Sequence, residues 1–186
     1  MTSIIKVDQI QKTDGSDFEF GGGVGSVVQK VVQPITAQSS CSTTAGTKSL
    51  IPDYTATITP KYANSKILVE IRWMGEFGVQ DNTYNGIFGI YNGTSYVGMP
   101  DGPDGSRNVG VSVPTLTYHA ANAATTTEAA YLSAIDEPNT TSPITYQLYF
   151  MGYLSMTMYN NRTVQDSNDN GQERGTSLIT LTEIRQ

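Results

Sequence analysis

The residue types that most often do chemistry in proteins are rare in this chain. Its 186 residues include one histidine, His119, and one cysteine, Cys41. A single histidine excludes any multi-histidine metal site, and a single cysteine excludes an intramolecular disulfide and a cysteine-based metal cluster. No nucleophile motif such as G-x-S-x-G accompanies His119, and no cation follows Cys41 before Lys48. We therefore expect no enzymatic activity and no cofactor.

A calcium-like spacing occurs once. Asp166, Asn168 and Asn170 alternate and are followed by Gly171, as in the first half of a calcium-binding loop, where alternate oxygen ligands surround the ion. The twelfth position, which needs a bidentate Glu, is Ser177. We interpret this segment as a polar surface turn and expect no tight metal site.

The elements that position these groups are predicted to be strands. The chain contains 24 Thr, 16 Ser and 11 Tyr, and only 15% of its residues are charged. Branched and aromatic side chains fit the pleated surface of a sheet. Short strands separated by turn signals, without a convincing helix, predict an all-β fold, an antiparallel β-sandwich that is jelly-roll-like.

Alternation with a period of two gives the strand positions. The clearest strand has Glu70 and Arg72 on its outward parity and four apolar residues on its inward parity: Ile67, Val69, Ile71 and Trp73. We expect those four side chains to be buried, with Trp73 as a core anchor. Further strands are expected at 54–58, 87–91, 115–120, 144–154, 156–159 and 177–184.

Two segments allow a second interpretation. The valines of residues 24–32 have helical as well as strand spacing, so a short coiled-coil stalk is the alternative there. The β-branched composition and Pro34 favour a strand. Residues 128–136 fit either a helix or a strand, and the flanking strands favour a strand.

A glycine joint divides the chain. Residues 1–25 read as an N-terminal arm, extended or a β-hairpin around Asp14-Gly15, which ends in the glycines of residues 21–25. Residues 26–186 form the β-sandwich domain. Two strands cannot fold alone, so we expect the apolar residues of the arm to anchor the protein to a partner: Ile5, Val7, Ile10, Phe18 and Phe20.

Three long polar loops are expected, at about 78–86, 99–114 and 160–175. Tyr149 and Tyr153 lie on the parity opposite the predicted core of their strand, which predicts a neutral aromatic outer face for sister subunits or sugars. The alternative is that both faces of this strand are covered within the sandwich.

Charge and hydropathy exclude several classes of protein. The formal net charge is −6, whereas a nucleic-acid binder needs Lys and Arg to displace counterions from phosphate. The sequence has no apolar run long enough for a signal peptide or a membrane span. We therefore expect assembly in a cytoplasm, no nucleic-acid partner and no membrane insertion.

Four stretches of the chain carry a resemblance to a known family. They are IIKVDQIQKTDGSDFEF, GSVVQKVVQ, TATITPKYANSKILVEIRW and RGTSLITLTEI, and ITPKYANSKILV is the most specific of them. Together they resemble virion structural proteins of tailed phages, especially cyanophage tail-fibre-like proteins. The resemblance covers both ends and the first two-fifths of the chain, but not residues 75–135.

The resemblance implies a virion component without catalytic residues. It implies a homotrimer whose N-terminal arm attaches to other virion proteins and whose β domain faces outward. The favoured function is a tail-associated fibre or receptor-binding protein whose outer loops contact a glycan or protein of the host surface. The chain is short for a fibre and has no shaft, which leaves a capsid decoration (cement) protein as an alternative.

A polysaccharide-degrading virion enzyme is the alternative from another class. It would need paired carboxylates in a groove, about 5–9.5 Å apart. No sequence motif indicates such a pair.

Overall fold

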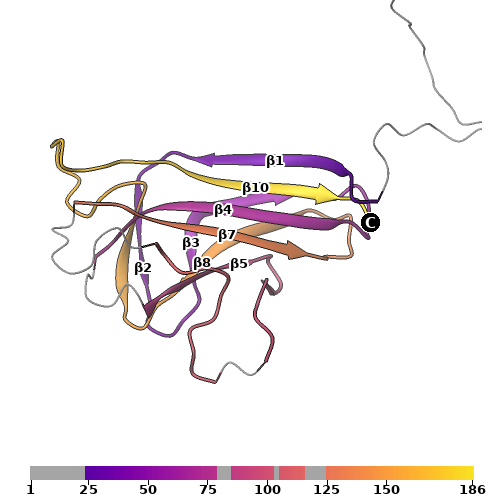
Figure 1. The fold of residues 1–186 in the computed structure, drawn as a ribbon, viewed down its shortest axis with the longest axis horizontal. Coiled ribbons are helices and arrows are strands. Elements are labelled where there is room, and N and C mark those ends of the chain that lie inside the picture. Colours follow the sequence, from indigo (N-terminus) through magenta and orange to yellow (C-terminus); the bar gives the residue numbers. More distant parts are fainter. Residues whose placement is uncertain (1–23, 79–84, 103–104, 116–124) are drawn as a thin grey trace, which may run out of the picture.

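The structure is a computed structural model that describes residues 24–78, 85–102, 105–115 and 125–186. Within these ranges the chain forms antiparallel strands in two packed sheets, so the fold is an all-β sandwich (Figure 1). The larger sheet contains β1 (Val27–Ile35), β2 (Ser39–Thr43), β4 (Lys66–Phe77), β7 (Glu128–Asp136), β9 (Met156–Asn160) and β10 (Ser177–Ile184). The smaller sheet contains β3 (Ser49–Ile58), β5 (Ile87–Tyr91), β6 (Tyr96–Val97) and β8 (Ile144–Met151).

The strand pairs are nested inside one another. β1 pairs with β10, β2 with β9, β3 with β8, β4 with β7, and β5 with β6, all in antiparallel fashion. The described strands thus behave as one long hairpin whose innermost turn lies between β5 and β6 and which is rolled into two layers. This nesting is jelly-roll topology, and it confirms the predicted fold class.

The core lies between the two sheets and is rich in aromatic rings. The predicted inward residues of β4 are all buried: Ile67, Val69, Ile71 and Trp73. The Trp73 ring centroid lies 4.9 Å from that of Phe88 on the opposite sheet, and the Trp73 indole N–H donates to Asn160 Oδ1 at 2.8 Å. Ring packing therefore joins the layers, while one hydrogen bond satisfies the polar atom of the indole.

The strand interpretations of the two ambiguous segments are confirmed. Residues 27–35 form β1 and residues 128–136 form β7. The prediction at 115–120 falls mostly on residues outside the described ranges, and only Thr115, which forms an isolated bridge with Ala129, is seen. Two short strands, β2 and β6, were not predicted, because Ser and Thr dominate the first and the second has two residues.

The prediction for Tyr149 is wrong. Its side chain is fully buried, and its hydroxyl donates to the Val109 carbonyl oxygen at 3.0 Å. The connection from β6 to β7 therefore covers this part of the smaller sheet, as the alternative interpretation required. Tyr153 lies in the turn after β8 and is exposed. In the described parts of the chain, no helix is long and apolar enough to cross a membrane.

Candidate functional site: the loop end of the sandwich

The sandwich has two distinct ends. At the arm end, Gly25 N–H donates to the Arg185 carbonyl oxygen at 2.7 Å, so the chain enters β1 beside its own C-terminus. At the loop end, Ile35 is opposite Ser177 in the register of β1 and β10, and Gly75 is opposite Glu128 in that of β4 and β7. The connections β4–β5 and β9–β10 join strand ends there, and the chain enters β7 at the same end (Figure 1).

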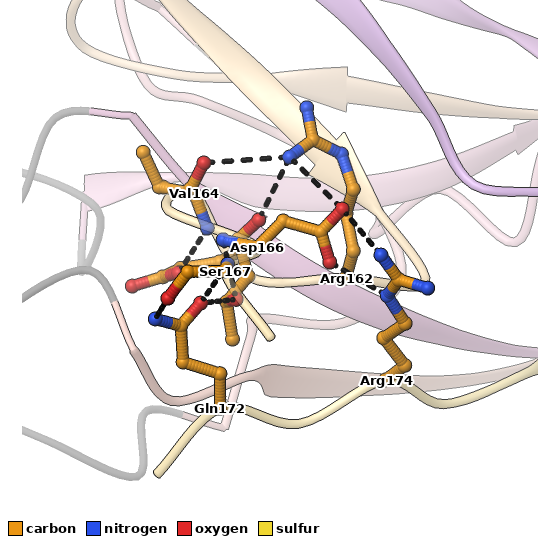
Figure 2. Close-up of polar contacts among 8 residues, drawn as sticks. Arg162, Val164, Asp166, Ser167, Gln172 and Arg174 are labelled. Carbon is orange, nitrogen blue, oxygen red and sulfur yellow. Dashed lines mark hydrogen bonds and ion pairs between the residues drawn. The ribbon is translucent and has the colours of Figure 1, made fainter. Parts of the chain in front are cut away.

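The β9–β10 connection is organised around Asp166, as Figure 2 shows. Arg174 donates from Nε to Asp166 Oδ1 at 2.7 Å and from Nη2 to Oδ2 at 2.9 Å. Arg162 Nη1 lies 3.8 Å from Oδ2, while its guanidinium stacks 4.5 Å from the centre of the Tyr159 ring. The hydrogen bond from Arg174 lowers the pKa of Asp166 below its ordinary value.

Gln172 fastens the other side of this loop. Its Oε1 accepts hydrogen bonds from Ser167 N–H at 2.7 Å and from the Thr163 hydroxyl at 3.2 Å, and its Nε2 donates to the Ser167 hydroxyl (Figure 2). Thr163 Oγ1 in turn accepts the N–H of Asp166 at 3.2 Å. These side-chain hydrogen bonds therefore stabilise one conformation of the β9–β10 connection.

The first and twelfth positions of the calcium-like spacing are engaged by other groups of the chain. Both carboxylate oxygens of Asp166 face Arg174, and Asp169 Oδ1 accepts the N–H of Gly171 at 2.8 Å. Ser177 lies inside β10, where its hydroxyl contacts Tyr54 and Asn161 at 2.9 and 2.7 Å. Among the residues that the structure describes, no group of three or more acidic, histidine or cysteine side chains could hold a metal ion.

Two buried carboxyl groups lie behind the loop. Glu76 is 1% exposed and Glu128 is 4% exposed, on the adjacent strands β4 and β7. Glu76 Oε2 accepts the N–H of Val164 at 2.6 Å, and Glu173 Oε2 accepts the N–H of Thr127 at 3.2 Å. These two contacts tie the β9–β10 connection to the ends of both strands.

Glu128 has the most altered chemistry at this end. Burial raises its pKa to about 8, and the nearby charge of Glu76 adds to the increase. Its Oε2 is buried without a hydrogen-bond partner in the described structure. Because Glu76 and Glu128 are both almost inaccessible, this pair is not presented to a polysaccharide in a groove. Glu128 shares the inward parity of β7 with Ala130, and a charged residue on an inward parity indicates a buried carboxyl group. The sequence-based prediction missed this signal.

The other predicted functional residues have different outcomes. Cys41 is half-buried in β2, and burial raises its pKa, which keeps the thiol protonated and a poor nucleophile. His119 lies outside the described residues. The predicted anchor residues also lie there: Ile5, Val7, Ile10, Phe18 and Phe20.

Comparisons with known proteins assign no family. No protein-family model matches the chain, and no curated protein is significantly similar to it. The fold and this end of the molecule define a class of protein. It is a jelly-roll domain whose ordered polar loop lies at the end opposite the one where the chain enters β1.

Proposed function

We propose that this protein is a structural component of a tailed-phage virion, a tail-associated fibre or receptor-binding protein. Residues 1–20 dock into other virion proteins, and the loop end faces the host surface. The chain works as a homotrimer, so that weak contacts of single loops add by effective concentration. The resemblance of the two ends and of residues 55–73 to phage virion proteins supports this class.

The observation that carries the proposal is the separation of the two ends. The described chain starts at the arm end, where Gly25 contacts Arg185. The loop held by Asp166 and Arg174 lies at the opposite end, beyond the start of β10. A protein attached through its N-terminus therefore presents this loop away from the attachment point. Asp and Arg side chains with fixed positions are suited to polar contacts with a glycan or a protein.

The proposal is tested with two variants that affect opposite ends. The first lacks residues 1–20. The second carries Asp166→Ala and Arg174→Ala, which remove the charged pair of the loop. Each is supplied to phage assembly in place of the parent protein, and particle occupancy and adsorption to host cells are measured.

We expect the truncated protein to fold but to be missing from particles. We expect the loop variant to be present at full occupancy on particles that adsorb less well. Full occupancy of the truncated protein would refute anchoring by the arm. Unchanged adsorption, with density for the protein on the head in a map of the particle, would show a capsid decoration protein instead.

A further inference from the structure

Asparagine is followed directly by glycine at three places in this chain: Asn85-Gly86, Asn92-Gly93 and Asn170-Gly171. Such a pair can react with itself, because the backbone nitrogen of the glycine attacks Cγ of the asparagine side chain. A bond forms between these two atoms, the Cγ–Nδ2 bond breaks, and ammonia leaves with the proton of the glycine N–H. Water then opens the resulting succinimide ring to aspartate or isoaspartate. Glycine favours the attack, since no Cβ shields its nitrogen.

The amide of Asn92 is fixed by hydrogen bonds on both sides. Its Oδ1 accepts the N–H of Thr94 at 3.0 Å and the N–H of Ser95 at 2.7 Å, and its Nδ2 donates to Asp136 Oδ2 at 2.9 Å. Ring closure turns this amide toward the Gly93 nitrogen and releases Nδ2 as ammonia, so these contacts must break first. The fold therefore protects Asn92 from the reaction.

The Asn85-Gly86 peptide is fixed by packing instead. Gly86 is buried, and a side chain there would collide with the Phe150 ring. The Asn85 carbonyl oxygen accepts a hydrogen bond from Asn108 Nδ2 at 2.7 Å. Ring closure at Asn85 rotates this peptide group against the aromatic ring and breaks the hydrogen bond. The fold therefore slows this pair as well.

Asn170 has neither kind of protection. Asn170 and Gly171 are both exposed, in a turn that Gln172 N–H closes by donating to the Asp169 carbonyl oxygen at 3.3 Å. Among the residues that the structure describes, none forms a hydrogen bond with the side-chain amide of Asn170. A Cβ on Gly171 would meet only Asp169 Oδ1, at 3.3 Å, so the space around the attacking nitrogen is open.

A carboxylate lies at the N–H that the reaction must deprotonate. Asp169 Oδ1 accepts the N–H of Gly171, with 2.8 Å between oxygen and nitrogen. A general base has to lie within hydrogen-bond reach of the proton that it takes, about 2.6–3.2 Å. In the described structure, neither Gly86 N–H nor Gly93 N–H donates to a carboxylate. The pair at Asn170 thus combines an unrestrained amide, an accessible nitrogen and a positioned base.

We propose that Asn170 deamidates in the folded protein without an enzyme, with the Gly171 nitrogen as nucleophile and the Asp169 carboxylate as the base that takes its proton. The proton then leaves with the departing ammonia, and water supplies the oxygen of the new carboxyl group. The product carries one more negative charge beside Asp169, in the connection that Asp166 and Arg174 organise. The reaction does not depend on the proposed function, whereas its effect on host contact rests on that function.

Mass spectrometry of the purified full chain compares the three pairs directly. One sample is incubated folded at pH 8, below the melting temperature, and a second is incubated in urea. Trypsin cleaves after Arg162 and Arg174, so Asn170 lies in the peptide of residues 163–174, whereas Asn85 and Asn92 lie in that of residues 73–107. In the folded sample Asn170 should react about tenfold faster than Asn92, because hydrogen bonds that must break raise the barrier at Asn92. In urea the three pairs should react at similar rates.

Two variants test the roles of the neighbouring residues, and a third is their control. Gly171→Ala places a methyl group beside the nucleophile, and Asp169→Ala removes the base, so both should slow the reaction of Asn170. Asp101→Ala removes an exposed carboxylate from another loop and should leave the rate unchanged. Circular dichroism checks that each variant is folded.

The proposal fails if Asn170 and Asn92 react equally fast in the folded parent, or if Asn170 reacts only in urea. It also fails if folded Asp169→Ala reacts as fast as the parent or faster, because the contact with Gly171 would then be protective or without effect. None of these measurements requires a phage, so this reaction can be refuted while the virion role stands, and the reverse.

Discussion

Glu183 accepts a hydrogen bond from the backbone N–H of Lys61, with 2.8 Å between Lys61 N and Glu183 Oε1. The same oxygen accepts the N–H of Tyr62 at 3.1 Å, and Oε2 accepts from Gln29 Nε2 at 2.6 Å. One fully buried carboxylate thus joins β1, the β3–β4 turn and β10. These three segments belong to the GSVVQ, ITPKYANSKILV and SLITLTEI stretches, so one buried acceptor connects parts of all three.

Replacing this carboxylate should destabilise the protein and change its response to acid. Burial alone would raise the pKa of Glu183, but the hydrogen bonds from Lys61, Gln29 and Tyr62 lower it below its ordinary 4.5. A lowered folded pKa contributes stability above pH 4.5, which is lost as the pH falls through the folded value. Glu183→Gln should therefore cost about 2 kcal/mol at pH 7 and lose less stability than the parent below pH 4.5.

Chemical denaturation from pH 3 to pH 7 tests this, with Glu137→Gln as the control. Glu137 forms an exposed ion pair with Lys66 at 2.8 Å, and such pairs contribute at most about 1 kcal/mol. If the two variants have the same stability and the same acid profile, the structural role of Glu183 is refuted.

Trp73 should be the largest single contributor to the core. It is fully buried, so Trp73→Ala should cost about 3–5 kcal/mol through lost burial and a cavity. Trp73→Phe keeps a ring but leaves Asn160 Oδ1 without its donor, which should cost about 1–3 kcal/mol. Thermal and urea unfolding measure both. Tyr153→Ala, at an exposed site, is the control, and a melting temperature of Trp73→Ala near that of this control would contradict the prediction.

Glu128 should make the protein less stable as the pH rises. Its folded pKa of about 8 exceeds the ordinary 4.5. The contribution of Glu128 to the free energy of unfolding is therefore fully present below pH 4.5 and is lost as the pH rises to about 8. The maximal slope for one such group is about 1.4 kcal/mol per pH unit. Glu128→Gln removes this titration and should gain on the parent between pH 5 and pH 8, with no further gain above. Urea titrations at pH 5, 6.5, 8 and 9 measure the stability of the parent and of Glu128→Gln. If the two stability profiles are parallel, a raised pKa of Glu128 is excluded.

Calcium should have little effect on the β9–β10 connection. Arg174 occupies both oxygens of Asp166, so an ion would have to displace a bidentate pair. Millimolar calcium should leave the melting temperature of the parent unchanged. A ligand stabilises the folded state strongly only when its concentration is well above its Kd. Arg174→Ala, which frees the carboxylate, is the variant in which a small calcium effect is expected. A large rise in the melting temperature of the parent at micromolar calcium would overturn this interpretation.

The strand pattern was predictable because alternation is a local property. Within residues 67–73, apolar residues on one parity alternate with Glu70 and Arg72 on the other. Every second side chain of a strand points to the same face. The same rule placed the inward side chains of β8. Residues 27–35 were assigned to a strand for a similar reason, since β-branched side chains restrict the backbone over a few residues.

The pairing of distant segments was beyond that rule. Tyr149 has outward parity on β8, yet its hydroxyl is covered by Met99 and Val109, and no local pattern specifies which loop will cross which face. Glu183 has inward parity, but its hydrogen-bond donor Gln29 lies 154 residues away in the chain.

The sequence by itself therefore determined the all-β class, the strand positions and the faces of the best-patterned strands, because local alternation fixes which way side chains point. Only the folded chain decided the nested pairing, the contact of Glu183 with Lys61 and the closure of Asp166 by Arg174. The physical reason is that strand register is chosen by side chains on different strands meeting in space. Such contacts depend on all the strands at once.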